Sequence, residues 1–85
     1  MLTFEIKNHD KISVGTAQVE IYCDREGLVS LIKILGHLEQ GSTHAHLQTP
    51  AWAGTELTER PYGEQTVLVH QVLIRVIPEK YVAHL

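Results

Sequence analysis

The sequence predicts an α+β fold in which one helix packs on one face of a four-stranded, mostly antiparallel sheet, with the elements in the order β-β-α-β-β. Three observations lead to this prediction. Apolar and polar residues alternate in residues 2–7, apolar residues recur at helical spacing in residues 28–38, and β-branched residues fill much of residues 66–77. Two such layers pack around a single core. We therefore expect residues 1–85 to form one domain.

The first two strands are expected on either side of a polar turn. The apolar residues of segment 2–6 share one face of the first strand, and the polar segment 8–11 follows as a hairpin turn. In the second strand, residues 12–23, the apolar residues move by one position after Gly15, which predicts a bulge there. The alternation places Cys23 on the apolar face, where we expect it to be buried, and Glu5 on the uncovered face.

One helix is expected to follow, beginning after Asp24 as its N-cap and ending near Gly41. Its apolar face is expected to contain Leu28, Leu31, Ile32, Leu35 and Leu38. Gly36 lies within this helix, where glycine costs about 1 kcal/mol relative to alanine. It marks either a close contact or a bend, and the sequence leaves the choice open.

The second half of the chain contains two expected strands separated by a long connection. Residues 44–49 alternate, with Ala45 and Leu47 on the inner side. Segment 50–65 is longer than most connections, which indicates either a small internal element or a working loop. The run 66–77 is apolar on nearly both faces, which predicts a central strand or a strand with a covered outer face. A homodimer contact would also cover this run.

Composition narrows the class of function. The chain has 85 residues, of which 44% are hydrophobic and 20% charged, so it has room for one core and favours a binding protein over an enzyme. Its formal charge is −3 and its basic residues are scattered, so we expect no nucleic-acid partner. A single cysteine, no basic leader and no apolar run of the roughly 20 residues that cross a bilayer predict a cytoplasmic protein without membrane contact.

A pair of histidines is the only arrangement that suggests a metal site. His44 and His46 stand two positions apart on an expected strand, so their side chains project to one side with Cα atoms roughly 6.5–7 Å apart, which suits two ligands of one Zn²⁺. A third ligand would have to come from His70, Glu20 or Cys23. Two ligands do not make a site, and the alternative is that both histidines are polar strand residues. We expect no metal and no cofactor.

Loop 50–65 has the composition of a protein-binding segment. It contains Trp52 and Tyr62 as candidate aromatic anchors, and three glutamates, Glu56 among them, against one arginine. Aromatic anchors and electrostatic steering are features of tight interfaces, so the loop could press into a basic site on another protein. The alternative is that Trp52 and Leu57 close a satellite core beneath the loop.

The segment HAHLQTPAWAGTEL, residues 44–57, resembles the signature of the bacterial immunity protein thirty-two family of polymorphic toxin systems. The shared pattern is an H-x-H-L strand, then T-P-x-W, a small residue, glycine and E-L. The Leu-rich helix after Asp24 and the final apolar strand fall in matching order. The resemblance implies a small protein made beside a toxin, which it binds and neutralises without catalysis. The segment after Pro78, and the apolar character of both faces of the final strand, have no counterpart in the pattern.

These observations predict a partner-binding surface for a cognate protein toxin, and no catalytic residue. We expect His44, His46, Trp52, Glu56 and Tyr62 to form or border that surface. Two alternatives remain open: a metal-binding or small hydrolytic protein centred on His44 and His46, and a homodimeric structural module that associates through the strand 66–77.

Overall fold

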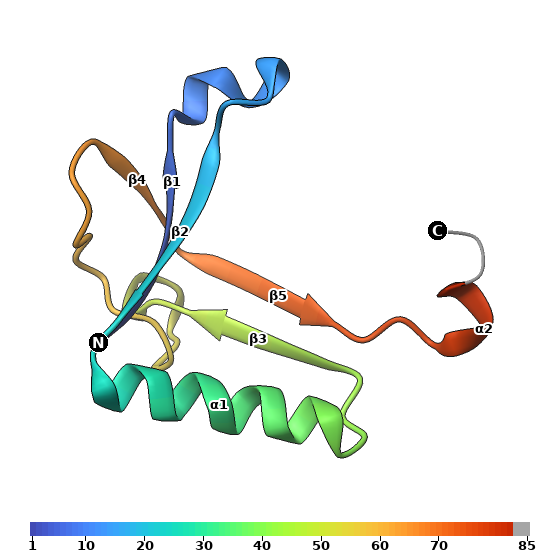
Figure 1. The fold of residues 1–85 in the computed structure, drawn as a ribbon. Helices are drawn as coiled ribbons and strands as arrows, with labels where there is room; N and C mark the ends of the chain where they lie inside the picture. Colours follow the sequence, from blue (N-terminus) through green and yellow to red (C-terminus); the bar gives the residue numbers. More distant parts are fainter. Residues whose placement is uncertain (83–85) are drawn as a thin grey trace.

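The chain forms two small antiparallel sheets with one main helix, as seen in a computed structural model (Figure 1). Residues 1–82 are described; the last three residues of the expected domain, 83–85, lie outside the described residues. The elements are β1 (Leu2–Lys7), η1 (His9–Val14), β2 (Gln18–Cys23), α1 (Arg25–Glu39), β3 (His44–Gln48), η2 (Pro50–Trp52), β4 (Thr66–Val69), β5 (Gln71–Arg75) and α2 (Glu79–Val82). The predicted α+β class is confirmed.

The strands form a sheet of three and a sheet of two, so the expected single four-stranded sheet is wrong. In the larger sheet, of order β2-β1-β4, Phe4 of β1 lies opposite Ile21 of β2 and Val69 of β4. In the smaller sheet, β3 pairs with β5, and Leu47 lies opposite Val72. Each sheet thus has an apolar side, because residues directly opposite each other point the same way.

The division between the sheets falls within the run 66–77, which was expected to be one strand. His70 alone separates β4 from β5, and the chain bends there. Because β4 pairs with β1 and β5 pairs with β3, each half has one strand neighbour among the described strands. The prediction of a central strand is therefore wrong.

The connection between β1 and β2 is a short 3₁₀ helix and not a continuation of β2. Asn8 and Gly15 flank η1 with φ values of 57° and 79°, in the left-handed region that these two residue types tolerate. Within this connection Ile12 and Val14 are 65% and 69% exposed. The expected strand at residues 12–14, with its bulge, is thus replaced by local turns, and β2 begins at Gln18.

Helix α1 begins and runs as the sequence predicts. The Asp24 side chain accepts a hydrogen bond from the Gly27 N–H at 2.8 Å, which caps the first turn. Leu31 and Ile34 pack against the core. The buried core itself consists of Leu2, Phe4, Leu47 and Leu57. Within residues 1–82, neither α1 nor any other helix is long and apolar enough to cross a membrane.

The apolar side of α1 is wider than the surface that covers it. Ile32 and Leu35, expected on the covered face, are 57% and 45% exposed. Figure 1 shows why: α1 lies along β3, whereas β1 and β2 run away from it after their shared end near the helix N-terminus. The helix therefore covers only the near end of the larger sheet.

Candidate functional site

Loop 50–65 lies between β3 and β4 and covers the polar side of β1. Its first residues turn back on the strand that precedes them, because Gly54 N–H donates to the Thr49 carbonyl at 3.0 Å. A Cβ on Gly54 would lie 2.4 Å from the Gln48 carbonyl oxygen, so only glycine allows this close approach. The loop is therefore built around a specific backbone contact.

The middle of the loop is attached to both sheets. Leu57 is 3% exposed, and its N–H donates to the Gln48 carbonyl at 3.1 Å. The Glu56 carboxylate accepts the Gln48 N–H at 3.0 Å, a bond that lowers the pKa of Glu56. On the other side, Thr58 N–H donates to the Leu2 carbonyl at 2.8 Å, and its hydroxyl accepts the Leu2 N–H at 3.1 Å.

The end of the loop is attached to a buried carboxylate. Glu5 of β1 is fully buried, and its two oxygens accept the backbone N–H groups of Tyr62 and Gly63, each at 2.9 Å. The same carboxylate accepts the hydroxyl protons of Thr3 and Thr66. Glu5 was expected on the uncovered face of the sheet, and this expectation is wrong because loop 50–65 covers that face.

Hydrogen bonding keeps Glu5 ionised despite its burial. Burial by itself raises the pKa of Glu5, but the bonds from Thr3, Thr66, Tyr62 and Gly63 outweigh it and lower the pKa to about 2. All four donors are neutral, so the carboxylate is stabilised by dipoles directed at it. The charge thus fixes the backbone at Tyr62 and Gly63.

Two aromatic side chains of loop 50–65 are exposed. Trp52, at the end of η2, is 54% exposed, and Tyr62 is 71% exposed. The ring of Tyr62 packs against the ring of Tyr22 on β2. The two rings form a tilted pair whose centroids are 5.2 Å apart. An ordered loop therefore presents two large rings to solvent.

Tyr22 is in turn held by its neighbour on β2. Its hydroxyl donates to the Glu20 carboxylate at 2.7 Å. This hydrogen bond, together with partial burial and the negative charge nearby, raises the pKa of Tyr22 to about 12. The ring that supports Tyr62 is therefore neutral and fixed in orientation at ordinary pH.

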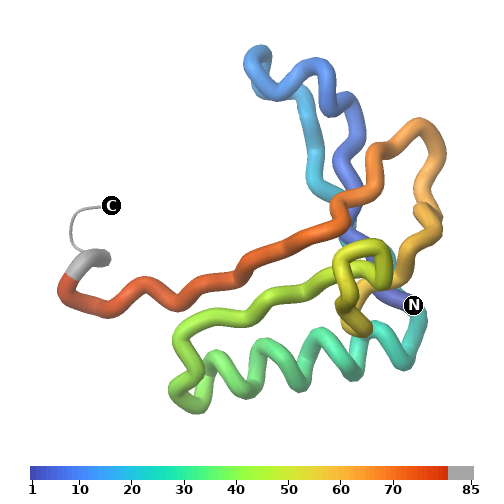
Figure 2. Tube along the Cα trace, turned by 180° about the vertical axis from the view of Figure 1, so that it is seen from behind, coloured from blue at the N-terminus to red at the C-terminus, as the bar shows by residue number. Residues whose placement is uncertain are grey.

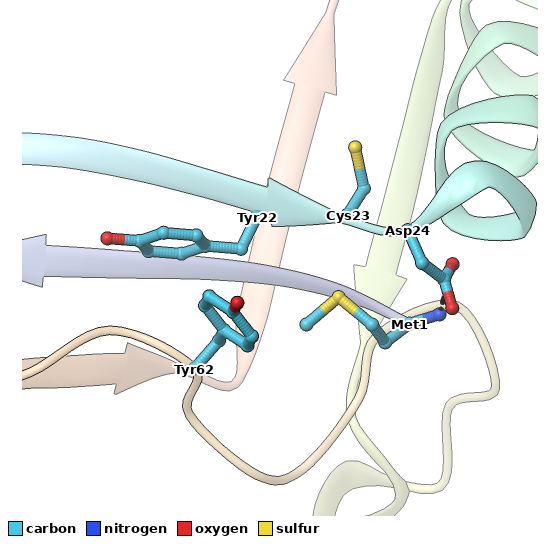
Figure 3. Close-up of a pocket in the computed structure, with 5 residues that line it drawn as sticks. All are labelled: Met1, Tyr22, Cys23, Asp24 and Tyr62. Atoms are coloured by element: carbon cyan, nitrogen blue, oxygen red, sulfur yellow. Dashed lines mark hydrogen bonds and ion pairs between the residues drawn. The ribbon is translucent and has the colours of Figure 1, made fainter.

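A cavity of about 310 Å³ opens next to the Tyr22–Tyr62 pair, as Figure 3 shows. Met1, Cys23 and Asp24 complete its lining. The Met1 ammonium group lies 2.6 Å from the Asp24 carboxylate, and this contact, with the Gly27 N–H, lowers the pKa of Asp24. Cys23 is exposed, so the expectation of a buried cysteine is wrong: it lies on β2, which is an edge strand of the larger sheet.

The three histidines considered as metal ligands are not gathered at one point. His44 and His46 are exposed on β3 with ring centroids 5.3 Å apart, edge to face. The His70 Nδ1 is 2.7 Å from the Thr49 hydroxyl, beyond the opposite end of β3 from His44. Within residues 1–82, no group of three or more histidine, cysteine, aspartate or glutamate residues could hold a metal ion.

The structure thus assigns different positions to the five residues expected at a partner surface. Trp52 and Tyr62 are exposed on loop 50–65, His44 and His46 are exposed on β3, and the Glu56 carboxylate is engaged with backbone. Sequence reasoning missed the residue that holds the loop, because the alternation of β1 shows only that Glu5 faces away from the apolar side. Thr3 and Thr66, its hydroxyl donors, gave no independent signal.

Comparison of the chain with models of known protein families, with curated proteins and with solved structures finds no match.

Proposed function

We propose that this chain is a cytoplasmic immunity-type protein, which binds a cognate bacterial toxin and neutralises it without catalysing a reaction. The observation that carries the proposal is the presentation of Trp52 and Tyr62, 54% and 71% exposed, on a loop held by hydrogen bonds at its start, middle and end. Large aromatic side chains on ordered backbone lose little conformational freedom on binding, which is the property of an interface anchor.

Charge supports the same surface. Loop 50–65 contains Glu56, Glu59 and Glu64 against Arg60, and Glu59 and Glu64 are exposed. Exposed acidic residues on the same loop as the aromatic anchors suit a basic partner, because opposite potentials accelerate encounter and fix orientation. Toxins that act on nucleic acid or other anionic substrates have basic sites of this kind, and the resemblance of residues 44–57 to the immunity family points to a toxin as the partner.

The experiment is capture of the partner by tagged protein in its native cells, followed by direct binding measurements on the purified pair. The proposal expects the captured protein to be encoded beside this chain, to arrest growth when expressed alone, and to be harmless when both are expressed. Replacement of Trp52 and Tyr62 by alanine is expected to weaken binding by at least about 30-fold if both rings are anchors.

A matched control comes from outside the loop. Ile12 is 65% exposed on η1, so Ile12→Ala removes a comparably exposed apolar side chain at a distance from the proposed surface. It is expected to leave affinity within about threefold of wild type, the range of a peripheral change. Unchanged affinity in the Trp52→Ala, Tyr62→Ala protein would exclude the loop as the binding surface, and capture of no toxic partner would count against the immunity function.

The alternative of a metal-binding protein has one observation in its favour, the neighbouring exposed rings of His44 and His46. Two histidines would need further ligands from outside the described residues or from a second molecule. Metal analysis of protein purified without chelator tests it directly: stoichiometric zinc that is lost in a His46→Ala variant would favour this alternative.

A further inference from the structure

One side of the larger sheet is apolar along its whole length but covered along only part of it. Phe4 is 9% exposed, whereas Val19, Ile21 and Val67 on the same side are 65%, 50% and 42% exposed. Ile6, which lies between Val19 and Val67, is half-buried. We name Ile6, Val19, Ile21 and Val67 the open face. The open face lies next to Phe4 of the buried core, on the same side of the sheet, and is exposed to solvent.

The open face contains no polar group that would explain its exposure. By register and alternation, all side chains of β1, β2 and β4 on this side are apolar or cysteine. Charged residues are depleted from the centres of permanent interfaces and common on ordinary protein surface. The composition of the open face is therefore that of a core surface.

In the rest of the described chain, too, more large hydrophobic residues are exposed than buried. Five hydrophobic residues are buried, against thirteen large hydrophobic residues that are exposed. Besides the open face, the exposed group includes Val29, Ile32 and Leu35 on α1 and Leu73, Val76 and Ile77 on or after β5. The described chain therefore leaves much of its apolar surface in contact with solvent.

The accessible surface area of the chain is larger than that of a compact monomer of the same mass. The chain exposes 6469 Å² for a mass of 9.6 kDa. A compact monomer of that mass exposes about 5,100 Å², so the chain has about 1,400 Å² in excess. Permanent dimers bury about 1,000–2,500 Å² on each partner. The excess over a compact monomer is thus similar in size to the area that one partner buries in a permanent dimer.

The outline of the molecule agrees with the area. The Cα radius of gyration is 14.4 Å, whereas a compact domain of this length has about 12 Å. Figure 2 shows two arms at a wide angle, the β1-β2 hairpin on one side and β3 with β5 and α1 on the other. The segment that projects after β5 adds to the difference, but the two arms diverge without it. The chain is therefore more extended than a compact domain of its length.

We propose that a second copy of this chain covers the open face, so that the protein is a two-fold symmetric homodimer. A two-fold axis covers the same surface on both copies in one contact, so it completes both cores without requiring a different partner. The expected contact strand 66–77 contributes Val67 to this surface. The open face lies on the side of the larger sheet opposite Glu5, whose carboxylate holds the Tyr62 backbone, so a dimer leaves Tyr62 free for the partner proposed above.

The first test uses the wild-type protein. Light scattering after size-exclusion chromatography is expected to give twice the 9.6 kDa chain mass at micromolar concentration. Thermal unfolding is expected to shift to higher temperature as protein concentration rises, because association stabilises only the folded state. A 9.6 kDa species whose midpoint is independent of concentration would overturn the proposal.

The second test locates the contact with a matched pair of variants. Val19 and Val14 are both exposed valines, at 65% and 69%, but only Val19 belongs to the open face. Val19→Lys is expected to raise the dimer dissociation constant at least about 30-fold, because it places a charge at a desolvated centre, whereas Val14→Lys is expected to change it less than about threefold. A dimer that withstands Val19→Lys would place the contact elsewhere and overturn the assignment of this face.

Val19→Lys could also prevent folding, and circular dichroism separates this outcome. An isolated chain would tolerate lysine at a position that is 65% exposed. Loss of folded protein in Val19→Lys, with Val14→Lys folded, would therefore also indicate that the open face is covered in the native protein. Failure of this proposal leaves the proposed role of Tyr62 untouched, because Tyr62 is held by Glu5 on the other side of the sheet.

Discussion

The carboxylate of Glu5 accepts the backbone N–H of Tyr62 at 2.9 Å, across 57 positions of sequence. A fully buried charge on β1 thereby fixes the backbone of a residue whose side chain is 71% exposed. The rigidity of the proposed binding loop and the stability of the larger sheet depend on the same group. This dependence can be tested by changing Glu5 alone.

Glu5→Gln is expected to lower the free energy of unfolding by about 2–4 kcal/mol, because one acceptor oxygen becomes an amide nitrogen that faces a donor. Chemical denaturation at one fixed protein concentration measures the change. The control is Glu64→Gln, which removes an exposed glutamate of the same loop and is expected to change stability by less than about 0.5 kcal/mol. Equal effects of the two substitutions would show that the buried carboxylate contributes no more to the free energy of unfolding than an exposed one.

The same group predicts how stability depends on pH. The pKa of Glu5 is about 2 in the folded chain, against its ordinary value of 4.5. A lowered folded-state pKa means that its stabilisation is complete above pH 4.5 and is lost as pH falls toward 2. Asp24 and Glu56, whose pKa values are also lowered, add in the same direction. Denaturation midpoints measured from pH 6 down to about 2 are expected to fall less steeply in Glu5→Gln than in wild type.

Two glycines are expected to respond in opposite ways to alanine. At Gly54 a Cβ would lie 2.4 Å from the Gln48 carbonyl oxygen, so Gly54→Ala is expected to destabilise the protein by about 1–3 kcal/mol. At Gly36 a Cβ would meet nothing within 4 Å, and the residue lies inside α1. Gly36→Ala is expected to stabilise by about 0.5–1 kcal/mol. Thermal unfolding compares the two, and destabilisation by Gly36→Ala would reveal a contact with another molecule at that position.

The phenol of Tyr22 is expected to ionise at higher pH than an ordinary tyrosine. The pKa of its phenol is raised to about 12, first by the hydrogen bond to Glu20 and then by partial burial and negative charge. Ring resonances followed by NMR through alkaline pH measure this pKa. In Glu20→Gln the charged acceptor is gone, so the pKa is expected to move down toward 10. An unchanged value in this variant would assign the shift to burial and to the charge of Glu5.

Trp52 is the sole tryptophan, so its fluorescence reports on one position of loop 50–65. Because it is 54% exposed, we expect efficient quenching by iodide in the free protein. Binding of a partner on the proposed surface is expected to reduce quenching and shift emission to shorter wavelength, since the indole leaves water. Quenching that is unaffected by a bound partner would place that partner on another part of the chain.

The local elements were largely predictable from sequence. Helix α1 was readable because Asp24 caps it and its apolar residues recur at one spacing, and β1 and β3 were readable from alternation. Both signals are local. The 3₁₀ helix that replaces residues 12–14 was not readable, because Ile12 and Val14 alternate as strand residues do, while Asn8 and Gly15 determine the turn.

What covers each face was not predictable, since alternation separates the two sides of a strand without showing what packs on them. Glu5 looked like a surface residue and is buried under a loop that begins more than forty positions later. Cys23 looked like a core residue and is exposed. The division of 66–77 at His70 also depends on tertiary packing, because β4 pairs with β1 at the start of the chain and β5 pairs with β3 near its middle.

The bend at His70 determines how the molecule can come apart. Since one residue joins β4 to β5, the two sheets share nearly continuous backbone and have no flexible tether between them. If β5 separated from β3, the unpaired β5 would destabilise the pairing of Val69 with Phe4 at the end of β4. Separation of β4 from β1 would destabilise β5 in the same way. Amide hydrogens of the two sheets should therefore exchange with solvent in a common opening event, and the chain should unfold as one cooperative unit despite its divided architecture.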